Sequence, residues 1–311
     1  MSDQITVNRN QMYNSSVYHQ VQQKGSKLEG LVRKETLKGK SGYFDSIGPV
    51  AAIKKTGRHS NTPQIDTPHN RRRVTMADYE WADLVDDQDK LRMIWDPTSY
   101  YVQAAVMAFG RSKDDVIIAS VSGTSYAGEE GETPVVLPTS RKIMANDGAG
   151  ASKLNVNTLR QIKYEFDKLD MDEQINMVID AKGVQDLLAD EKLTNQDYAV
   201  VKALATGEVN AFMGINFIMC NRVVSQDGAL LFNNDGSFDS GAGDNVDADG
   251  FTKFLAFAQS GVIMAVGEDI TTKIDVRADK SYSTQVYARM SIGGTRLEEE
   301  KVLEVLVNPA A

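Results

Sequence analysis

The residue types that most often carry out chemistry are scarce in this chain. Its 311 residues include one cysteine, Cys220, and three histidines, all of which lie before residue 70. A disulfide framework, a cysteine-rich zinc site or a thiol redox pair requires more sulfur than this. A serine triad in its usual order is excluded as well, because no histidine follows the glycine-flanked Ser125. Cys220 lies in an apolar run and is expected to be a small buried side chain.

One segment approaches a calcium-binding loop without completing it. Asn245, Asp247, Asp249 and Gly250 match positions one, three, five and six of such a loop. The twelfth position is Ala256, where a bidentate glutamate is required. An acidic solvated loop is therefore the favoured interpretation of this segment.

Adjacent carboxylates are common along the chain. A hydrolase needs two carboxyl groups that face each other across a cleft in unequal environments. Runs of neighbouring charges usually belong to solvated faces instead. We therefore expect no catalytic residues, no metal and no cofactor. The runs in question are Asp86–Asp87, Asp114–Asp115, Glu129–Glu130 and Glu298–Glu300.

The net charge of −9 conceals a division along the chain. Residues 1–75 carry 13 Lys and Arg against 5 Asp and Glu, a balance of +8, so the remaining residues have a balance of −17. A chain divided in this way could bind nucleic acid with its basic end, or could bind the acidic part of a neighbouring copy.

The strongest basic cluster is Arg71-Arg72-Arg73, close to His69. Counterion release makes such clusters effective nucleic-acid contacts, but no aromatic residue is interleaved with this one, as single-strand binding requires. Seven acidic residues between Asp78 and Asp96 offer an alternative partner. The sequence therefore favours salt bridges between subunits, with DNA binding through residues 1–75 as the alternative.

The elements that would position these residues fall into three groups. Residues 1–30 are polar and predict an arm that orders only against a partner. Residues 31–76 are rich in glycine and proline with little apolar material, which predicts an extended two-stranded arm lying on another molecule. A long helix is predicted over 97–122, because Asp96 can cap it, Pro97 fits its first turn and Gly123 can end it.

The rest of the chain predicts an α+β fold. A second helix is expected near 157–169, and helices are also expected over 182–190, 195–206 and 252–259. Gly293-Gly294 is expected to turn the chain. The chain contains no run of about 18 apolar residues, so the sequence predicts no membrane span. The expected strands include 175–179, 209–212, 215–222, 262–266, 270–277, 283–292 and 302–307.

Several local motifs, together with this layout, resemble the major capsid proteins of tailed bacteriophages, in particular a short-tailed branch. The resemblance implies the Hong Kong phage capsid fold and covers nearly the whole chain. The motifs are Thr62-Pro63, Thr67-Pro68-His69, Arg71-Arg72-Arg73, Tyr79-Glu80-Trp81-Ala82-Asp83-Leu84, Asp86-Asp87-Gln88-Asp89-Lys90, Asp96-Pro97-Thr98 and Gly293-Gly294-Thr295-Arg296-Leu297-Glu298.

The resemblance also implies a domain organisation. It assigns residues 1–30 to an N-terminal arm and 31–78 to an extended loop. Residues 79–174, including the spine helix 97–122, would form a peripheral domain to which the return strands 281–311 belong. Residues 175–280 would form an axial domain.

A structural function follows from the resemblance. Copies would assemble into hexamers and pentamers of an icosahedral shell in the virion, formed in the host bacterial cytoplasm. The expected partners are a scaffolding protein, a portal at one vertex, a possible decoration protein and packaged double-stranded DNA held by non-specific contact. A protein-filled compartment of the encapsulin type remains an alternative with the same fold. The expected inter-subunit contact residues are Lys54, Lys55, Arg58, Arg71, Arg72, Arg73, Asp86, Asp87, Asp89, Glu298, Glu299 and Glu300.

Overall fold

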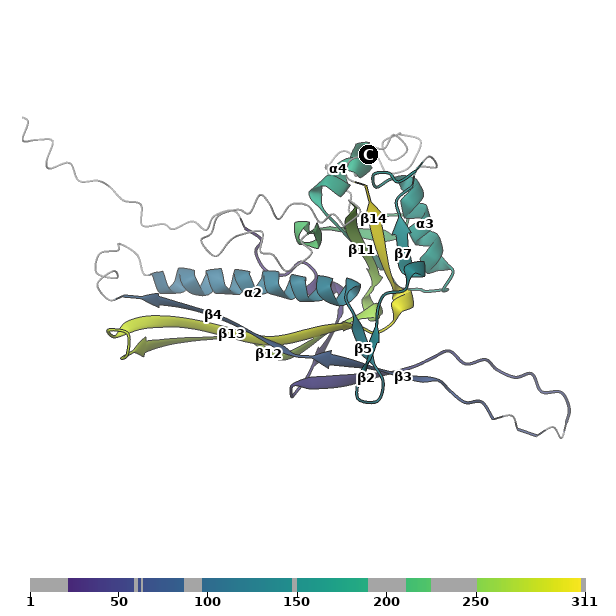
Figure 1. The fold of residues 1–311 in the computed structure, drawn as a ribbon, viewed down its shortest axis with the longest axis horizontal. Helices are drawn as coiled ribbons and strands as arrows, with labels where there is room; N and C mark the ends of the chain where they lie inside the picture. Colours follow the sequence, from purple (N-terminus) through teal and green to yellow (C-terminus); the bar gives the residue numbers. More distant parts are fainter. Residues whose placement is uncertain are drawn as a thin grey trace, which may run out of the picture. The chain divides into compact units, whose positions relative to one another are not determined.

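The computed structural model describes residues 22–58, 61–62, 64–86, 97–146, 150–189, 211–224 and 251–308 (Figure 1). The helices in these ranges are α2 (Pro97–Ser122), α3 (Val156–Asp167) and α4 (Ala181–Ala189). The strands are β1 (Arg33–Thr36), β2 (Ser41–Ile47), β3 (His69–Thr75), β4 (Ala77–Val85), β5 (Ser125–Ala127), β6 (Thr133–Val135), β7 (Lys142–Met144), β8 (Ile175–Ile179), β9 (Ala211–Phe212), β10 (Ile215–Met219), β11 (Thr252–Ala258), β12 (Val262–Arg277), β13 (Ser283–Arg296) and β14 (Val302–Val307).

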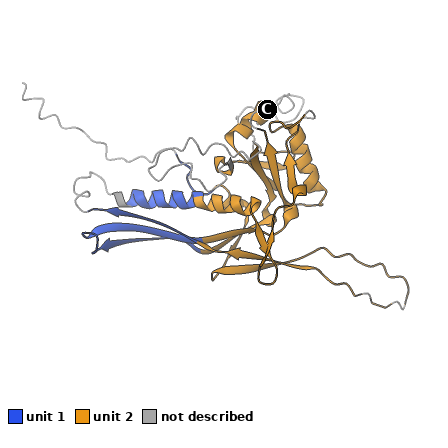
Figure 2. Cartoon of the chain, in the orientation of Figure 1, with its two compact units in different colours: residues 1–26, 78–111, 268–291 blue, residues 27–77, 112–267, 292–311 orange. Residues whose placement is uncertain are grey.

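The described strands form three sheets, and the α+β class predicted from the sequence is confirmed. Their orders are β1-β12-β13-β4, β7-β14-β11-β8-β10-β9 and β2-β3-β5-β6. The chain divides into two compact units (Figure 2). Unit 1 comprises residues 1–26, 78–111 and 268–291, and unit 2 comprises residues 27–77, 112–267 and 292–311.

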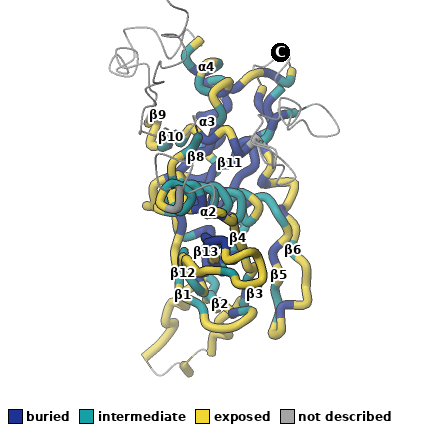
Figure 3. The backbone as a smooth tube through the Cα atoms, turned by 90° about the vertical axis from the view of Figure 1, so that its left-hand side faces the viewer, coloured by how far each residue is buried: buried dark blue, intermediate teal, exposed yellow. Residues whose placement is uncertain are grey.

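The six-stranded sheet of unit 2 contains a large group of buried apolar residues. Every residue of β8 is buried, and Figure 3 shows long buried stretches in β8 and β11. Helix α3 has a buried stripe of Leu159, Ile162 and Phe166, at the spacing of an amphipathic helix. The Asn155 side chain caps its first turn by accepting a hydrogen bond of 2.9 Å from the Thr158 amide. This helix was predicted from the same periodicity.

The four-stranded sheet of unit 2 forms the base of a projecting hairpin. Strands β2 and β3 pair antiparallel from Ser41 opposite Thr75 to Ile47 opposite His69. Residues 49–58 beyond this base are all exposed. The predicted pairing of two strands is therefore confirmed, with one correction, and the contact of this arm with another molecule stays a prediction. Residues 33–36 are not part of it, because β1 pairs in parallel with β12.

The long helix α2 has the bounds that the sequence predicted. Its 26 residues correspond to roughly 39 Å at 1.5 Å per residue. Its glycine, Gly110, lies against the backbone of Gly25 in unit 1, where an added Cβ would be 2.6 Å from the Gly25 Cα atom. Close backbone approach, rather than a bend, accounts for a glycine inside this helix.

Residues 252–258 form a strand, and the helix predicted there was wrong. In β11, Phe254–Ala258 are all buried, because the strand lies between β14 and β8 in the middle of its sheet. A strand buried on both faces gives a continuous apolar run, which has no period of two and is easily mistaken for a helix.

Gly293 and Gly294 do not turn the chain as predicted. Both lie inside β13, where they allow other segments to approach closely. A Cβ at Gly293 would lie 2.3 Å from the Thr75 carbonyl oxygen, and one at Gly294 would lie 2.2 Å from the Ser120 hydroxyl. Glycine is required here by proximity rather than by a turn.

The end of the predicted N-terminal arm is bound within its own chain. Leu28 is fully buried, and its amide donates a hydrogen bond of 3.0 Å to the carboxylate of Asp114. The Lys27 amide donates to both oxygens of that carboxylate at 3.1 Å. These residues therefore order without a partner. The remaining predictions for 1–21, the helix at 195–206 and the acidic loop with the calcium-like motif at 245–250 lie outside the described residues.

Candidate functional site

Strand β3 directs its three consecutive arginines to opposite faces of the sheet. Side chains alternate along a strand, so Arg71 and Arg73 share one face and Arg72 occupies the other. Arg72 is buried, with 8% of its surface exposed, whereas the Arg71 side chain is 41% exposed. The buried Arg72 and the more exposed Arg71 and Arg73 therefore have different contacts.

Arg72 joins the hairpin base to the segment that follows β13. Its Nη2 atom donates to both carboxylate oxygens of Glu299, at 2.8 and 2.7 Å, and its Nε atom donates to the Leu297 carbonyl at 3.2 Å. The Glu299 side chain is only 18% exposed, so this pair is largely screened from water. Such a pair constrains geometry because removal of one partner leaves the other charge buried.

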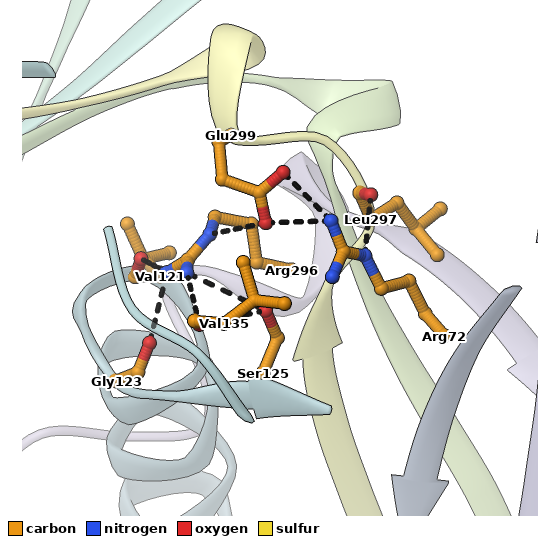
Figure 4. Close-up of polar contacts among 8 residues, drawn as sticks. All are labelled: Arg72, Val121, Gly123, Ser125, Val135, Arg296, Leu297 and Glu299. Atoms are coloured by element: carbon orange, nitrogen blue, oxygen red, sulfur yellow. Dashed lines mark hydrogen bonds and ion pairs between the residues drawn. The ribbon is translucent and has the colours of Figure 1, made fainter. Parts of the chain in front are cut away.

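Arg296, at the end of β13, is fully buried and lies beside the same glutamate (Figure 4). Its Nε atom is 3.6 Å from Glu299 Oε1. Its Nη1 atom donates to the carbonyls of Val121 and Gly123 at 2.8 and 2.9 Å, at the C-terminal end of α2. A cation here donates to helix carbonyls that have no partner within the helix, and it interacts favourably with the negative end of the helix dipole.

The other guanidinium nitrogen of Arg296 reaches the neighbouring sheet. Nη2 donates to the Val135 carbonyl of β6 at 3.1 Å and to the Ser125 hydroxyl of β5 at 3.4 Å. Burial lowers the pKa of Arg296, while the charge of Glu299 opposes that change. We name Arg72, Arg296 and Glu299 the arginine junction. It connects β3, β5, β6, β13 and the end of α2 in unit 2.

The opposite face of β3 is exposed and carries different contacts. Arg71 forms a salt bridge with Asp45 of β2, with N–O distances of 2.6 and 3.2 Å. This hydrogen-bonded cation lowers the pKa of Asp45. Arg71 also lies over the ring of Tyr43, 5.7 Å from its centroid, and Arg73 lies over Tyr126 at 5.1 Å.

The predicted contact residues are thus distributed over several places. Lys54, Lys55 and Arg58 are exposed on the hairpin beyond β2. Asp86 is exposed and accepts a hydrogen bond of 3.3 Å from the Ser283 hydroxyl. Glu298 lies 3.3 Å from Lys301, and Glu300 is exposed. Asp87 and Asp89 lie outside the described residues.

Two predictions about charged runs require correction. Glu298–Glu300 is not simply a solvated face, because Glu299 holds two buried arginines. Asp114 and Asp115 are not solvated either: Asp114 is fully buried, and Asp115 forms a bidentate salt bridge with Arg222. Charged residues in runs gave no signal of which member turns inward.

Sequence reasoning missed Arg296 as a structural centre. It was quoted only within the motif Gly293–Glu298, although an arginine near the end of an apolar strand is an available signal for a buried ion pair. The described residues contain no group of His, Cys, Asp or Glu that could hold a metal ion. No helix in the described ranges is long and apolar enough to cross a bilayer.

The fold of this chain is similar to the folds of chains in solved bacteriophage capsid structures. The fold is similar to the capsid structure of cyanophage P-SCSP1u, with a TM-score of 0.72, 16% identity and coverage of 97% of this chain and 94% of that chain. It is similar to the acidic stable capsid structure of Helicobacter pylori bacteriophage KHP30, with a TM-score of 0.72, 11% identity and coverage of 99% and 98%. It is also similar to Mycobacterium phage Che8, with a TM-score of 0.67, 14% identity and coverage of 96% and 97%. These likenesses establish the fold.

The family follows from the sequence. Residues 5–308 match the family model described as phage capsid protein, and the chain belongs to this family. No curated protein sequence matches it. The chain is therefore a structural, non-enzymatic protein of a bacteriophage capsid, as the resemblance in its motifs implied.

Proposed function

We propose that the chain is the repeating subunit of an icosahedral shell, in which hexamers and pentamers enclose double-stranded DNA. The observation that carries this proposal is the hairpin beyond β2 and β3. Val50 and Ile53 are 56% and 60% exposed there, and no residue of 49–58 is buried in its own chain. Exposed apolar side chains on a projecting segment are typical of an interaction surface. In the shell, this hairpin lies on an adjacent subunit.

The predicted contact residues take separate roles in this proposal. The cations Lys54, Lys55, Arg58, Arg71 and Arg73 contact adjacent subunits, and Asp86, Asp87, Asp89, Glu298 and Glu300 are candidate acidic partners. Arg72 and Glu299 pair within the chain and hold the hairpin base instead. A basic residue on the hairpin can steer the approach of an acidic neighbour as well as bind it.

The wider roles extend the same proposal. The sequence assigned residues 79–174 and 281–311 to a peripheral domain and 175–280 to an axial domain around the five-fold and six-fold axes. Because β7 and β14 share a sheet with β8, β10 and β11, we assign them to the axial domain as well, and we assign β12, which shares a sheet with β4 and β13, to the peripheral domain. A scaffolding protein guides assembly in the host cytoplasm, a portal occupies one vertex, and a decoration protein is a further candidate partner. The packaged DNA contacts the shell without sequence specificity.

Negative-stain electron microscopy of the purified chain, alone and with its scaffolding protein, tests the proposal. We expect closed hollow particles. Replacement of residues 50–66 by a short Gly-Ser linker should leave folded subunits that form none, with circular dichroism as the control for folding. A wild-type chain that stays monomeric in every condition would refute the proposal. Particles that contain protein instead of DNA when isolated from infected cells would favour the encapsulin type of compartment.

A further inference from the structure

One face of the β2-β3-β5-β6 sheet is an exposed surface of tyrosine and arginine. Tyr43, Arg73 and Tyr126 form one cross-strand row, because Arg73 lies opposite Tyr43 on β2 and opposite Tyr126 on β5. The two tyrosines are 44% and 42% exposed although each has a guanidinium group over its ring. Tyrosine and arginine are the residue types that dominate the centres of protein interfaces. We name this surface the tyrosine face.

An acidic turn borders the tyrosine face. The turn between β5 and β6 carries Glu129, Glu130 and Glu132, all exposed, and their carboxylates form no salt bridge with the described residues. The turn is held against the sheet by its backbone, since the Glu130 carbonyl accepts hydrogen bonds from Tyr43 Oη at 3.3 Å and Arg73 Nη1 at 3.4 Å. The backbone of the turn is therefore fixed against the sheet, while its acidic side chains are exposed to solvent.

A hollow separates the turn from the hairpin base. Its volume is about 540 Å³, and it is lined by Asp45, His69, Asn70, Arg71 and residues 127–129. With the turn included, the tyrosine face has the two cations Arg71 and Arg73 against four carboxylates, those of Asp45 and the three glutamates. The surface thus combines exposed aromatic area, a concave entrance and an excess of negative charge.

The segment with complementary properties lies in the same chain. Residues 48–58 contain Lys54, Lys55 and Arg58 and no acidic residue. None of these three cations forms a salt bridge with the part of the chain that the structure describes. Val50 and Ile53 add the apolar side chains that exposed tyrosine rings can cover. We name this segment the hairpin tip.

The hairpin tip does not contact the turn of its own copy. It runs away from β5 in unit 2 (Figure 1). An extended chain advances roughly 3.3 Å per residue, so Lys54, seven residues after the end of β2, can lie about 23 Å beyond it. The pairing of opposite charges and apolar surfaces must therefore come from a second copy.

We propose that the tyrosine face and acidic turn of one subunit receive the hairpin tip of a second copy of this chain. This inference rests on the proposed function and adds to it the place where the hairpin binds. Lys54, Lys55 and Arg58 pair with Glu129, Glu130 and Glu132, while Val50 and Ile53 cover the exposed parts of Tyr43 and Tyr126.

A charge exchange in the full-length chain tests the inference. The variant E129K/E130K/E132K and the variant K54E/K55E/R58E should each reduce particle yield roughly tenfold, since like charges then meet across the interface. The variant with all six changes should recover most of the wild-type yield. The exposed Asp172, which lies in the α3–β8 connection, provides the control D172K, which should assemble as the wild type does.

The outcomes separate this inference from the proposed function. If the wild type assembles and the variant E129K/E130K/E132K assembles equally well, the inference alone is refuted. If the wild-type chain never assembles, both the inference and the proposed function are refuted. Rescue of K54E/K55E/R58E by D78K/E80K/D83K, and not by reversal of the turn, would place the tip on the acidic strand β4 instead. Disulfides between copies in the variant K54C/E130C/C220A, seen only in assembled material as a ladder of covalent dimers and higher oligomers, would support the proposed contact directly.

Discussion

The Nη2 atom of Arg72 donates to both carboxylate oxygens of Glu299, at 2.8 and 2.7 Å, although 227 residues separate the two in the sequence. The same carboxylate lies 3.6 Å from Arg296. One negative charge therefore serves two buried guanidinium groups, which connect the hairpin base to the end of α2. This arrangement holds strand β3, at the base of the hairpin, to the end of α2 within unit 2.

Loss of Glu299 should destabilise unit 2 strongly. The variant E299Q leaves Arg72 and Arg296 buried without their nearest carboxylate, and we expect a loss of about 3 kcal/mol in the free energy of unfolding. Urea unfolding followed by circular dichroism would measure it. The neighbouring E300Q is the matched control, because Glu300 is exposed, and its midpoint should stay at the wild-type value. Equal midpoints for the two variants would contradict the junction.

Replacement of Arg296 by lysine should not preserve the junction. Lysine keeps the charge but lacks the planar fork that reaches Val121, Gly123 and Val135 at once. R296K should lower the free energy of unfolding by about 2 kcal/mol. Arg277 forms a salt bridge with Asp279 at the surface, so the control R277K should have the same free energy of unfolding as the wild type. An R296K chain as stable as the wild type would show that charge alone is required.

The ends of α2 were predictable from the sequence, whereas the junction was not. Pro97 and Gly123 act on the backbone next to them, so their effect on the helix ends does not depend on distant parts of the fold and can be predicted from the sequence. Arg296 gains its role from carbonyls of segments more than 160 residues away, so its place at the end of an apolar strand can signal burial but not the groups that it contacts. The error at 252–258 has a related cause, since only neighbouring strands on both sides explain why its apolar residues do not alternate.

Asp114 should determine whether the N-terminal segment stays attached. Its buried carboxylate accepts the amides of Lys27 and Leu28. The variant D114A leaves these amides without an acceptor, at a cost of about 1–3 kcal/mol. Limited proteolysis should then cut near residues 22–32 at a higher rate, while D172A should digest as the wild type does. Unchanged protection in D114A would show that burial of Leu28 suffices.

Gly293 should not tolerate even one added methyl group. The Cβ of G293A would lie 2.3 Å from the Thr75 carbonyl oxygen, which belongs to the backbone and cannot move aside cheaply. We expect a loss of about 1–3 kcal/mol from overpacking. G30A is the control, because nothing lies within 4 Å of the corresponding Cβ. Thermal unfolding of the two variants would distinguish proximity from the turn that the sequence suggested.

The hairpin between β12 and β13 provides a prediction about pH. A hydrogen bond from Arg277 lowers the pKa of Asp279 from 3.8 to about 2. A carboxyl group whose pKa is lower in the folded state stabilises that state above its unfolded pKa. The contribution is therefore complete above about pH 4 and is lost as the pH falls towards 2. Carbon-detected NMR of the Asp279 carboxyl should show a midpoint near pH 2 in the wild type. The variant R277Q should move the midpoint back towards 3.8, and a midpoint already near 3.8 in the wild-type chain would contradict the pairing at this hairpin.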